Sequence, residues 1–423
     1  MVNQFNGSFR RYGKVIALLA SSSFASSCIS LVSAPILGRL YEPAEYGELT
    51  EFTVLATGLS TISTLGLPTT IIMEENDASR RSIAVACLYC VVIVGCIGGG
   101  LLWATVAGVK FLLFLPVVCS LAGVTTISSA FLNRNQQYRS LALSSIVSSF
   151  STASLSVIFG AFDFGVYGLF YAYLFGQVIL AFTMFRTLQN SLSISDFIAI
   201  HKLIPSILPY KGFIFYTLPS AFVQNLTVNS VAYALSFAGQ DASLGAFSRA
   251  VQILALPLNP IMNAVSQVFQ RDAVELLQNG KSCRPLFVRT LSFLIVMPFF
   301  PSIVILLFAP LIFSVILGPK WLEAGEIARI LLPMYFLQCL CNPLANMFFV
   351  RKKNHLAFII SMFTALITFL IVFSVGKYTE NTRMIVIAYS LAGCLSYLVF
   401  LFYAYRLASS SSCENVDIPK TDI

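Results

Sequence analysis

Residues 291–317 read LSFLIVMPFFPSIVILLFAPLIFSVIL, without a single charged side chain. A helix of about 20 apolar residues is long enough to cross the roughly 30 Å hydrocarbon core of a bilayer. The rest of the chain has the same character, because 57% of its 423 residues are hydrophobic, 10% are charged and its mean hydropathy is +0.83. These values exclude a water-soluble globular protein and predict an all-α integral membrane protein.

Apolar runs of similar length recur along the whole sequence, with short polar gaps between them. Each run is long enough for one crossing, so the sequence predicts about twelve transmembrane helices. The runs lie at residues 15–38, 49–73, 82–107, 111–132, 140–160, 166–185, 213–237, 245–269, 290–317, 327–350, 356–376 and 384–405.

Basic residues sort the gaps into two sides. With the N-terminus in the cytoplasm, 19 of the 26 Lys and Arg residues fall in cytoplasmic segments, and membrane proteins carry an excess of Lys and Arg on that side. The pattern predicts both termini on the cytoplasmic side of the membrane. Because this bias explains the net charge of +8, the charge does not indicate a nucleic-acid partner.

The longest gap between runs separates two sets of six. We expect an N-terminal lobe at 1–186, a cytoplasmic linker at 187–212, a C-terminal lobe at 213–406 and a disordered cytoplasmic tail at 407–423. The linker stretch SISDFIAIHKLIPSIL at 193–208 fits a short interfacial helix and a plain connector equally well.

Both sets of six begin in the cytoplasm, so a duplication would relate the two lobes as a parallel repeat. An alignment of Leu37 with Leu235 matches an outer turn and a glycine before the following helix, although few identities survive. The sequence therefore gives the repeat weak support.

Polar side chains recur every three or four residues in several runs, and in hydrocarbon such groups must face protein or water. Ser, Thr and Asn also bond helices together without a cavity, and for the first run both interpretations stay open. The stripe of the eighth run needs more partners than one helix contact supplies, which predicts a water-filled lumen. That stripe consists of Arg249, Gln252, Asn259, Asn263, Ser266 and Gln270, and shorter stripes include Gln224 in the seventh run and Gln338, Asn342 and Asn346 in the tenth.

Few ionisable residues lie away from the cytoplasmic edges. Arg249 and Glu51 are the candidates for functional charges near the lumen, and Glu51 is the first candidate for coupling to an ion gradient. Arg39 ends the first run and is able to reach the surface, whereas Arg329 lies three residues from Glu326, a spacing that suits an ion pair.

Proline residues mark two of the polar runs. Pro219 lies in the seventh run, and Pro257 and Pro260 lie in the eighth. Each removes a backbone donor and predicts a kink.

The sequence shows no motif typical of a metal site or of an enzyme active site. Ten cysteines lie almost wholly within the runs, where a thiol acts as a small apolar group, and the two histidines lie at cytoplasmic edges. We therefore expect no metal site and no cofactor. The outer gaps are short and carry no paired-carboxylate motif, so we expect a protein that is not an enzyme.

Three stretches beside predicted outer turns resemble a known family. They are APILGRLYEPAEYGELTEF from Ala34, SLGAFSRAVQILALPLNP from Ser243 and ILGPKWLEAGEIARILLP from Ile316. With the number of runs and the spacing of the lobes, they resemble the polysaccharide-transporter branch of the multidrug/oligosaccharidyl-lipid/polysaccharide (MOP) exporters, the Wzx-type O-unit flippases. The resemblance covers essentially the whole chain.

The resemblance implies a two-lobed MATE-like bundle lined by the first, second, seventh and eighth runs. Such a protein moves undecaprenyl-diphosphate-linked oligosaccharides, the repeat units of O-antigen, capsule or exopolysaccharide, from the cytoplasmic to the periplasmic leaflet by alternating access. It implies that Arg249 holds the diphosphate, with Arg39 and Arg329 behind it. The amides expected to bind sugar are Gln252, Asn259, Asn263, Gln224 and Asn342.

The implied partners are this lipid-linked oligosaccharide, membrane lipids, and the polymerase and chain-length regulator of lipopolysaccharide assembly. One alternative is a drug or cation exporter of the same superfamily, which should carry carboxylates deep in a lumen that here leans cationic. Another is a membrane glycosyltransferase or polymerase, which needs a sizeable catalytic region outside the membrane.

Overall fold

The structure is a computed structural model that describes residues 22–74, 76–105, 110–189, 205, 208–278, 280–351, 353–379 and 381–409. Most of the expected linker helix at 193–208 lies outside these ranges. The tail from residue 410 onward lies outside them as well.

The first half of the described chain forms one bundle. In it α2, α4, α5 and α7 pack on one another, and α6 packs along α7. The elements are the first helix (Ser22–Leu40), α2 (Pro43–Ser63), α3 (Pro68–Met73), α4 (Asp77–Thr105), η1 (Leu112–Phe114), α5 (Leu115–Arg134), α6 (Tyr138–Ala161) and α7 (Gly165–Gln189).

The second half forms another bundle, with α14 at its centre against α12, α13 and α17. Its elements are η3 (Leu208–Tyr210), α10 (Lys211–Val228), α11 (Ser230–Phe237), α12 (Asp241–Gln278), α13 (Arg284–Leu317), η4 (Pro319–Trp321), α14 (Leu322–Leu344), α15 (Asn346–Val350), α16 (Asn354–Tyr378) and α17 (Thr382–Ser409).

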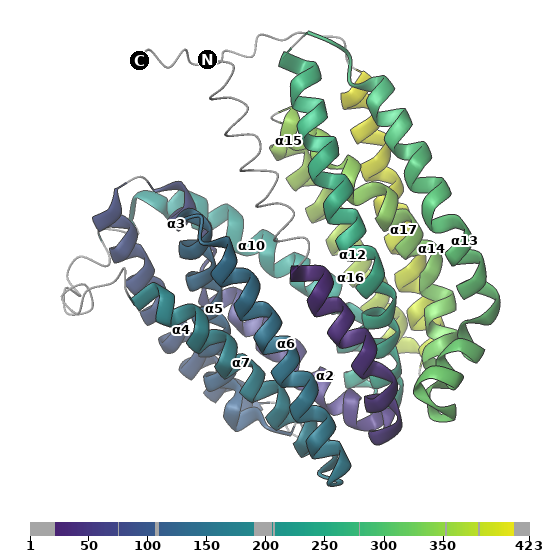
Figure 1. The fold of residues 1–423 in the computed structure, drawn as a ribbon. Helices are drawn as coiled ribbons and strands as arrows, with labels where there is room; N and C mark the ends of the chain where they lie inside the picture. Colours follow the sequence, from purple (N-terminus) through teal and green to yellow (C-terminus); the bar gives the residue numbers. More distant parts are fainter. Residues whose placement is uncertain are drawn as a thin grey trace.

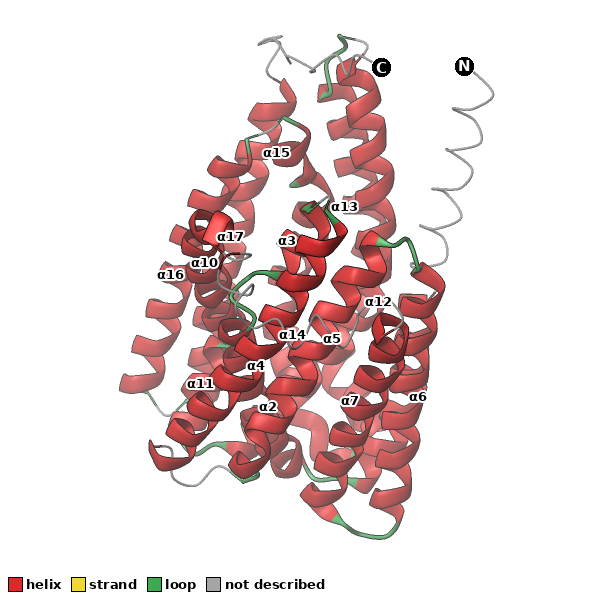
Figure 2. Ribbon diagram, turned by 90° about the vertical axis from the view of Figure 1, so that its left-hand side faces the viewer, coloured by secondary structure: helices red, strands yellow, loops and turns green. Residues whose placement is uncertain are grey.

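Within the described ranges, a helix or a pair of helices occupies each of the twelve predicted runs, and no strand occurs (Figure 2). Nine of the described helices are long and apolar enough to cross a membrane. The runs of α2, α10–α11 and α12 are not among these nine, because polar residues lower their hydropathy. They are still long enough, since α2 with 21 residues and α12 with 38 residues extend about 31 and 57 Å at 1.5 Å per residue.

Three predicted continuous runs are broken. The tenth run is split at Ala345, between α14 and α15. The second run is split between α2 and α3, where Leu65 and Gly66 have φ angles of 52° and 69° and Pro68 begins the new helix. Proline at a first helical turn lacks only a donor that would be unpaired there anyway. The seventh run is interrupted at Asn229 rather than at Pro219, which lies inside α10.

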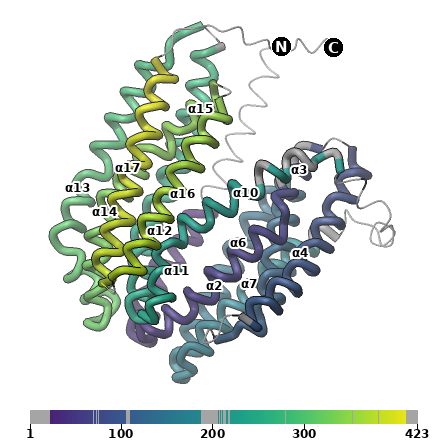
Figure 3. Tube along the Cα trace, turned by 180° about the vertical axis from the view of Figure 1, so that it is seen from behind, coloured from purple at the N-terminus to yellow at the C-terminus, as the bar shows by residue number. Residues whose placement is uncertain are grey.

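The two bundles meet at one end and separate towards the other (Figures 1 and 3). We call the end where α2 and α12 begin the closed end, and the end where α3 and α15 lie the open end. The helix α2 contacts α10, α11 and α12 of the second bundle. The helix α10 runs between the bundles, because Ile214 packs against the hydrophobic cluster of the first bundle that contains Leu67, and Thr227 donates to the backbone oxygen of Ala365 in α16.

Candidate functional site

The three stretches that carry the family resemblance meet at the closed end. Nε1 of the fully buried Trp321 donates a hydrogen bond of 2.7 Å to the backbone oxygen of Gly38. Beside it, Nζ of Lys320 lies 2.8 Å from Oε1 of Glu42. The end of the first helix therefore docks on the η4 turn of the second bundle.

Two glycines let α2 and α12 touch backbone to backbone. A Cβ atom on Gly245 would lie 1.8 Å from the backbone oxygen of Pro43, and one on Gly47 would lie 1.9 Å from that of Asp241. Real Cβ atoms do not approach backbone so closely, so any larger residue would force the two helices apart. These glycines bring the bundles into direct contact.

Arg249 lies beneath this contact and is 3% exposed. The centre of its guanidinium is 3.7 Å from the ring centroid of Tyr46 and 5.9 Å from that of Trp321. Nη1 donates 2.7 Å to Oε1 of Gln252, whereas Nε and Nη2 have no hydrogen-bond partner. In this conformation Arg249 therefore does not line an open lumen, since Tyr46 and Trp321 cover it.

The Arg249 cluster, defined as Tyr46, Arg249 and Trp321, joins three elements. The rings of Tyr46 and Trp321 meet edge to face with their centroids 5.6 Å apart. A desolvated cation–π contact contributes about 2 kcal/mol. The cluster thus stabilises the closed end, and sequence reasoning found only its arginine.

Carboxylates of α2 face both bundles near the same end. Glu51 is half-buried and accepts a hydrogen bond from the hydroxyl of Ser236 in α11. Glu48 pairs with Lys110 of its own bundle at 2.8 Å, and this hydrogen bond raises the pKa of Lys110 above its usual range. Glu51 therefore links α2 to the second bundle.

The stripe of α12 has two parts. Gln252, Asn259 and Asn263 are exposed. Further along, Nδ2 of Asn346 donates to Ser266, at 3.4 Å to the backbone oxygen, so this part of the stripe bonds helices together. Amides in the middle of a membrane-spanning helix need polar surroundings, which favours a hydrated space beside the first part.

Arg39 and Arg329 are exposed. Nη2 of Arg329 donates to the backbone oxygen of Leu307 in α13, at 3.1 Å. The expected pair with Glu326 is wrong, because Glu326 accepts from Arg383 at 2.6 Å, which reaches it from the neighbouring α17. Neither arginine is part of the Arg249 cluster.

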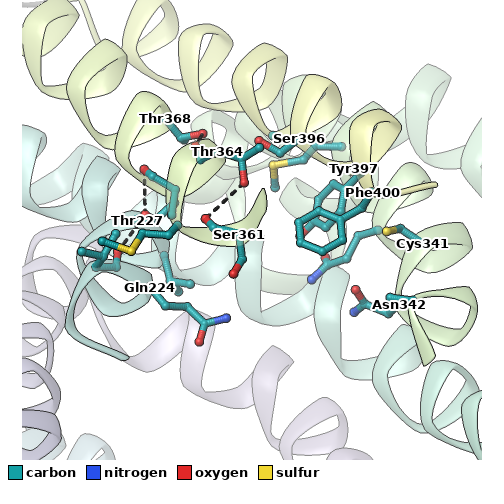
Figure 4. A pocket seen from close by; sticks show the side chains of 18 of the residues that line it. Gln224, Thr227, Cys341, Asn342, Ser361, Thr364, Thr368, Ser396, Tyr397 and Phe400 are labelled. Carbon is teal, nitrogen blue, oxygen red and sulfur yellow. Dashed lines mark hydrogen bonds between the residues drawn. The ribbon is translucent and has the colours of Figure 1, made fainter. Parts of the chain in front are cut away.

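Gln224 and Asn342 lie on a cavity of about 460 Å³ within the second bundle (Figure 4). Four helices enclose it: α10, α14, α16 and α17. Sequence reasoning missed the polar residues of α16, although Ser361, Thr364 and Thr368 recur at three- and four-residue steps. The polar and aromatic residues of the lining are Ser220, Gln224, Thr227, Gln338, Asn342, Phe358, Ser361, Thr364, Thr368, Tyr389, Ser396, Tyr397 and Phe400.

Comparisons with known proteins agree with this architecture. A family model described as "Polysaccharide biosynthesis protein" matches residues 36–326. A search of curated protein sequences finds no significant match. Among solved structures, the lipid II flippase MurJ in an inward closed conformation has a TM-score of 0.72 at 13% identity, covering 92% of this chain and 87% of that chain.

Two other solved structures show a lower similarity. A MOP superfamily transporter from Pyrococcus furiosus has a TM-score of 0.57 at 15% identity, and a MATE transporter in complex with MaL6 has 0.57 at 14% identity. Each comparison covers 94% of this chain and 96% of the other. At these identities the likeness shows the fold, and the predicted MATE-like bundle is confirmed.

Proposed function

Because the chain belongs to the polysaccharide biosynthesis protein family, we propose that it is a flippase for undecaprenyl-diphosphate-linked oligosaccharides. The chain is a multi-pass membrane protein, and its family and fold are those of transporters. On that basis the expectation that it is not an enzyme is confirmed. The substrate, the O-antigen or related repeat unit, belongs to the proposal.

The observation that carries the proposal is the exposed amide stripe of α12. Gln252, Asn259 and Asn263 lie on a helix that contacts α2 at the closed end and then follows the diverging second bundle (Figure 1). Amide groups both donate and accept hydrogen bonds, as sugar hydroxyls do. A glycan would bind between the bundles while its lipid tail stays in the bilayer.

Alternating access follows from the two ends. We place the open end and both termini in the cytoplasm of a bacterial cell, where the Lys and Arg bias puts them, and the closed end at the periplasm. The lipid-linked unit enters at the open end, and separation of α2 from α12 releases it at the other leaflet. The released unit would then reach the polymerase and chain-length regulator of the inner membrane.

Arg249 is the proposed anchor of the diphosphate. Its Nε and Nη2 atoms have no partner and become accessible when Tyr46 and Trp321 separate. A bidentate guanidinium suits a diphosphate. Arg249 would therefore hold the closed end shut in one state and receive the anion in the other.

Membrane voltage favours this direction. Moving about two negative charges outward gains roughly 2.3 kcal/mol per charge per 100 mV. Glu51, which bonds Ser236 across the bundles, is our candidate for added coupling to an ion gradient.

A cation exporter is the alternative within the same fold. Such a protein needs carboxylates in its binding space, and among the described residues that line the 460 Å³ cavity none is acidic. The cavity therefore gives no support to a cationic substrate.

Reconstitution tests the proposal. The full-length protein would be placed in liposomes containing a fluorescent undecaprenyl-diphosphate disaccharide, and reduction of the label by an impermeant reagent would report its leaflet. We expect the inner-leaflet pool to become accessible faster than in protein-free vesicles and in vesicles with heat-inactivated protein. Equal rates with folded protein would contradict a flippase.

A further inference from the structure

We propose that the cavity between α10, α14, α16 and α17 binds an uncharged sugar residue of the transported unit. This inference rests on the proposed function for its biological meaning, but the cavity itself stands on its geometry. Its lining comes from helices of the second bundle, and no residue of the Arg249 cluster lines it.

The lining offers hydrogen bonds without charge. All the side chains that the structure describes around the cavity are neutral, and they include hydroxyl groups and three amides, Gln224, Gln338 and Asn342. Burying an ion without a partner costs far more than burying a hydroxyl group that finds one. The cavity therefore selects against uronic acids and free amino sugars.

The hydroxyl groups of the cavity lining can accept hydrogen bonds from a ligand. Thr227 donates to Val223 and Ala365, Thr364 to Ile360, and Ser361 to Phe358, in each case to a backbone oxygen. A hydroxyl group has one proton and two lone pairs, so these groups keep acceptor capacity. Sugar hydroxyls would donate to them.

The amides supply the missing donors. Gln224 and Asn342 are exposed although they line the cavity, so they lie at its opening. Nδ2 of Asn342 lies 3.7 Å from the sulfur of Met262, which is a weak hydrogen-bond acceptor. A sugar oxygen in its place would make a stronger hydrogen bond. Both side chains are therefore placed to bind a ligand that enters.

Aromatic rings form the opposite end. Figure 4 shows Gln224 and Thr227 at one end of the cavity and Tyr397 and Phe400 at the other. Aromatic rings present an electron-rich face, on which the C–H face of a pyranose stacks. In the same view Asn342 lies beside these rings, so a sugar there would meet both an aromatic face and an amide.

The size of the cavity limits what it holds. Small-molecule sites have volumes of roughly 300–1,000 Å³, and about 460 Å³ lies in the lower part of that range. The cavity has room for a mono- or disaccharide rather than for a whole repeat unit. It would thus recognise one part of the glycan.

Binding of free disaccharides to the full-length protein in detergent tests the inference. The neutral probes are N,N′-diacetylchitobiose and cellobiose, and the charged probes are cationic chitobiose and anionic cellobiouronic acid. We expect at least one neutral probe to bind at least tenfold more tightly than both charged probes. Binding of a charged probe as tight as that of the neutral ones, or binding of neither neutral probe, would overturn the proposal.

Variants locate the binding. Gln224→Leu and Asn342→Leu, which keep size but remove the amide, should each weaken binding at least tenfold. Thr364→Val should also weaken disaccharide binding. Its matched control, Thr126→Val, should leave binding unchanged. Both threonines donate to a carbonyl of their own helix, but Thr126 lies on the exposed face of α5. Unchanged melting temperatures would show that the variants fold.

Failure of the inference and of the proposed function are distinguishable. If the wild type flips lipid-linked glycan in vesicles while the cavity variants bind disaccharide unchanged, the cavity assignment is overturned and the function stands. If the variants lose binding but the wild type flips nothing, the sugar site stands and the flippase proposal fails.

Discussion

We propose two roles for Arg249, and its position in the sequence reveals only part of them. The spacing of polar residues in the eighth run predicts that Arg249 faces away from lipid, and at 3% exposure it does. The pattern along one helix does not show which rings lie opposite. Tyr46 and Trp321 come from elsewhere in the chain, although both lie in stretches that carry the family resemblance.

Replacing Arg249 tests its charge. Arg249→Ala should reduce flipping ten- to hundredfold, because a hydrogen bond to a charged group contributes about 1.5–3 kcal/mol. Arg249→Lys should keep a measurable part, since Lys keeps the charge but loses the bidentate fork. The control is Arg289→Ala, an exposed basic residue of α13. Full flipping by a well-folded Arg249→Ala protein would end the anchor role.

Replacing Tyr46 tests the ring against its hydroxyl group. The hydroxyl group has no hydrogen-bond partner, so Tyr46→Phe should behave like the wild type. Tyr46→Ala loses a contact of about 2 kcal/mol. It should shift the equilibrium roughly thirtyfold from the state in which α2 and α12 are in contact to the state in which they are separated. Hydrogen exchange of residues 241–250, followed by mass spectrometry, should rise in Tyr46→Ala alone. Equal protection from exchange in the wild type, Tyr46→Phe and Tyr46→Ala would show that the Arg249 cluster does not hold α2 and α12 together.

At the scale of helices, α2 and α12 control the closed end. Their contact depends on Gly47 and Gly245, the glycines that the alignment of Leu37 with Leu235 matches, but the sequence does not show that the two helices touch there. By contrast, the long apolar helices follow directly from their composition, and α13 occupies the quoted run with a few residues added at its start. The break at Leu65 and Gly66 was missed because the apolar pattern continues across it.

Gly245→Ala should prevent α2 and α12 from coming into contact at the closed end. The new methyl group would lie 1.8 Å from the backbone oxygen of Pro43, so α2 and α12 must separate. We expect flipping to fall at least tenfold with little loss of melting temperature. Gly100→Ala is the matched control, since its methyl group would meet no atom within 4 Å. Wild-type flipping by Gly245→Ala would show that the contact is dispensable.

At the scale of the molecule, the sequence predicts the number of helices and the family, whereas the pairing of helices needed the structure. Gln224 and Asn342 were expected in one central lumen, but they share a cavity inside the second bundle with Ser361 and Thr364 of α16. A stripe shows that a residue avoids lipid but not which helix it faces. The lobe boundaries stay a prediction.

The central claim is that the two ends open in alternation, and distances across both ends test it most directly. Spin labels at Phe162 and Tyr378, on opposite bundles near the closed end, and at Asn135 and His355, near the open end, are all at exposed positions. Labels attached through a noncanonical ketone residue leave the native cysteines in place. The measurement is pulsed electron resonance in nanodiscs with and without an undecaprenyl-diphosphate disaccharide.

We predict that the substrate populates a second state, in which the distance between residues 162 and 378 increases while the distance between residues 135 and 355 decreases. Gly245→Ala should favour this state without substrate. If both distances keep a single distribution under every condition, or if they increase together, the bundles do not alternate and the account is wrong.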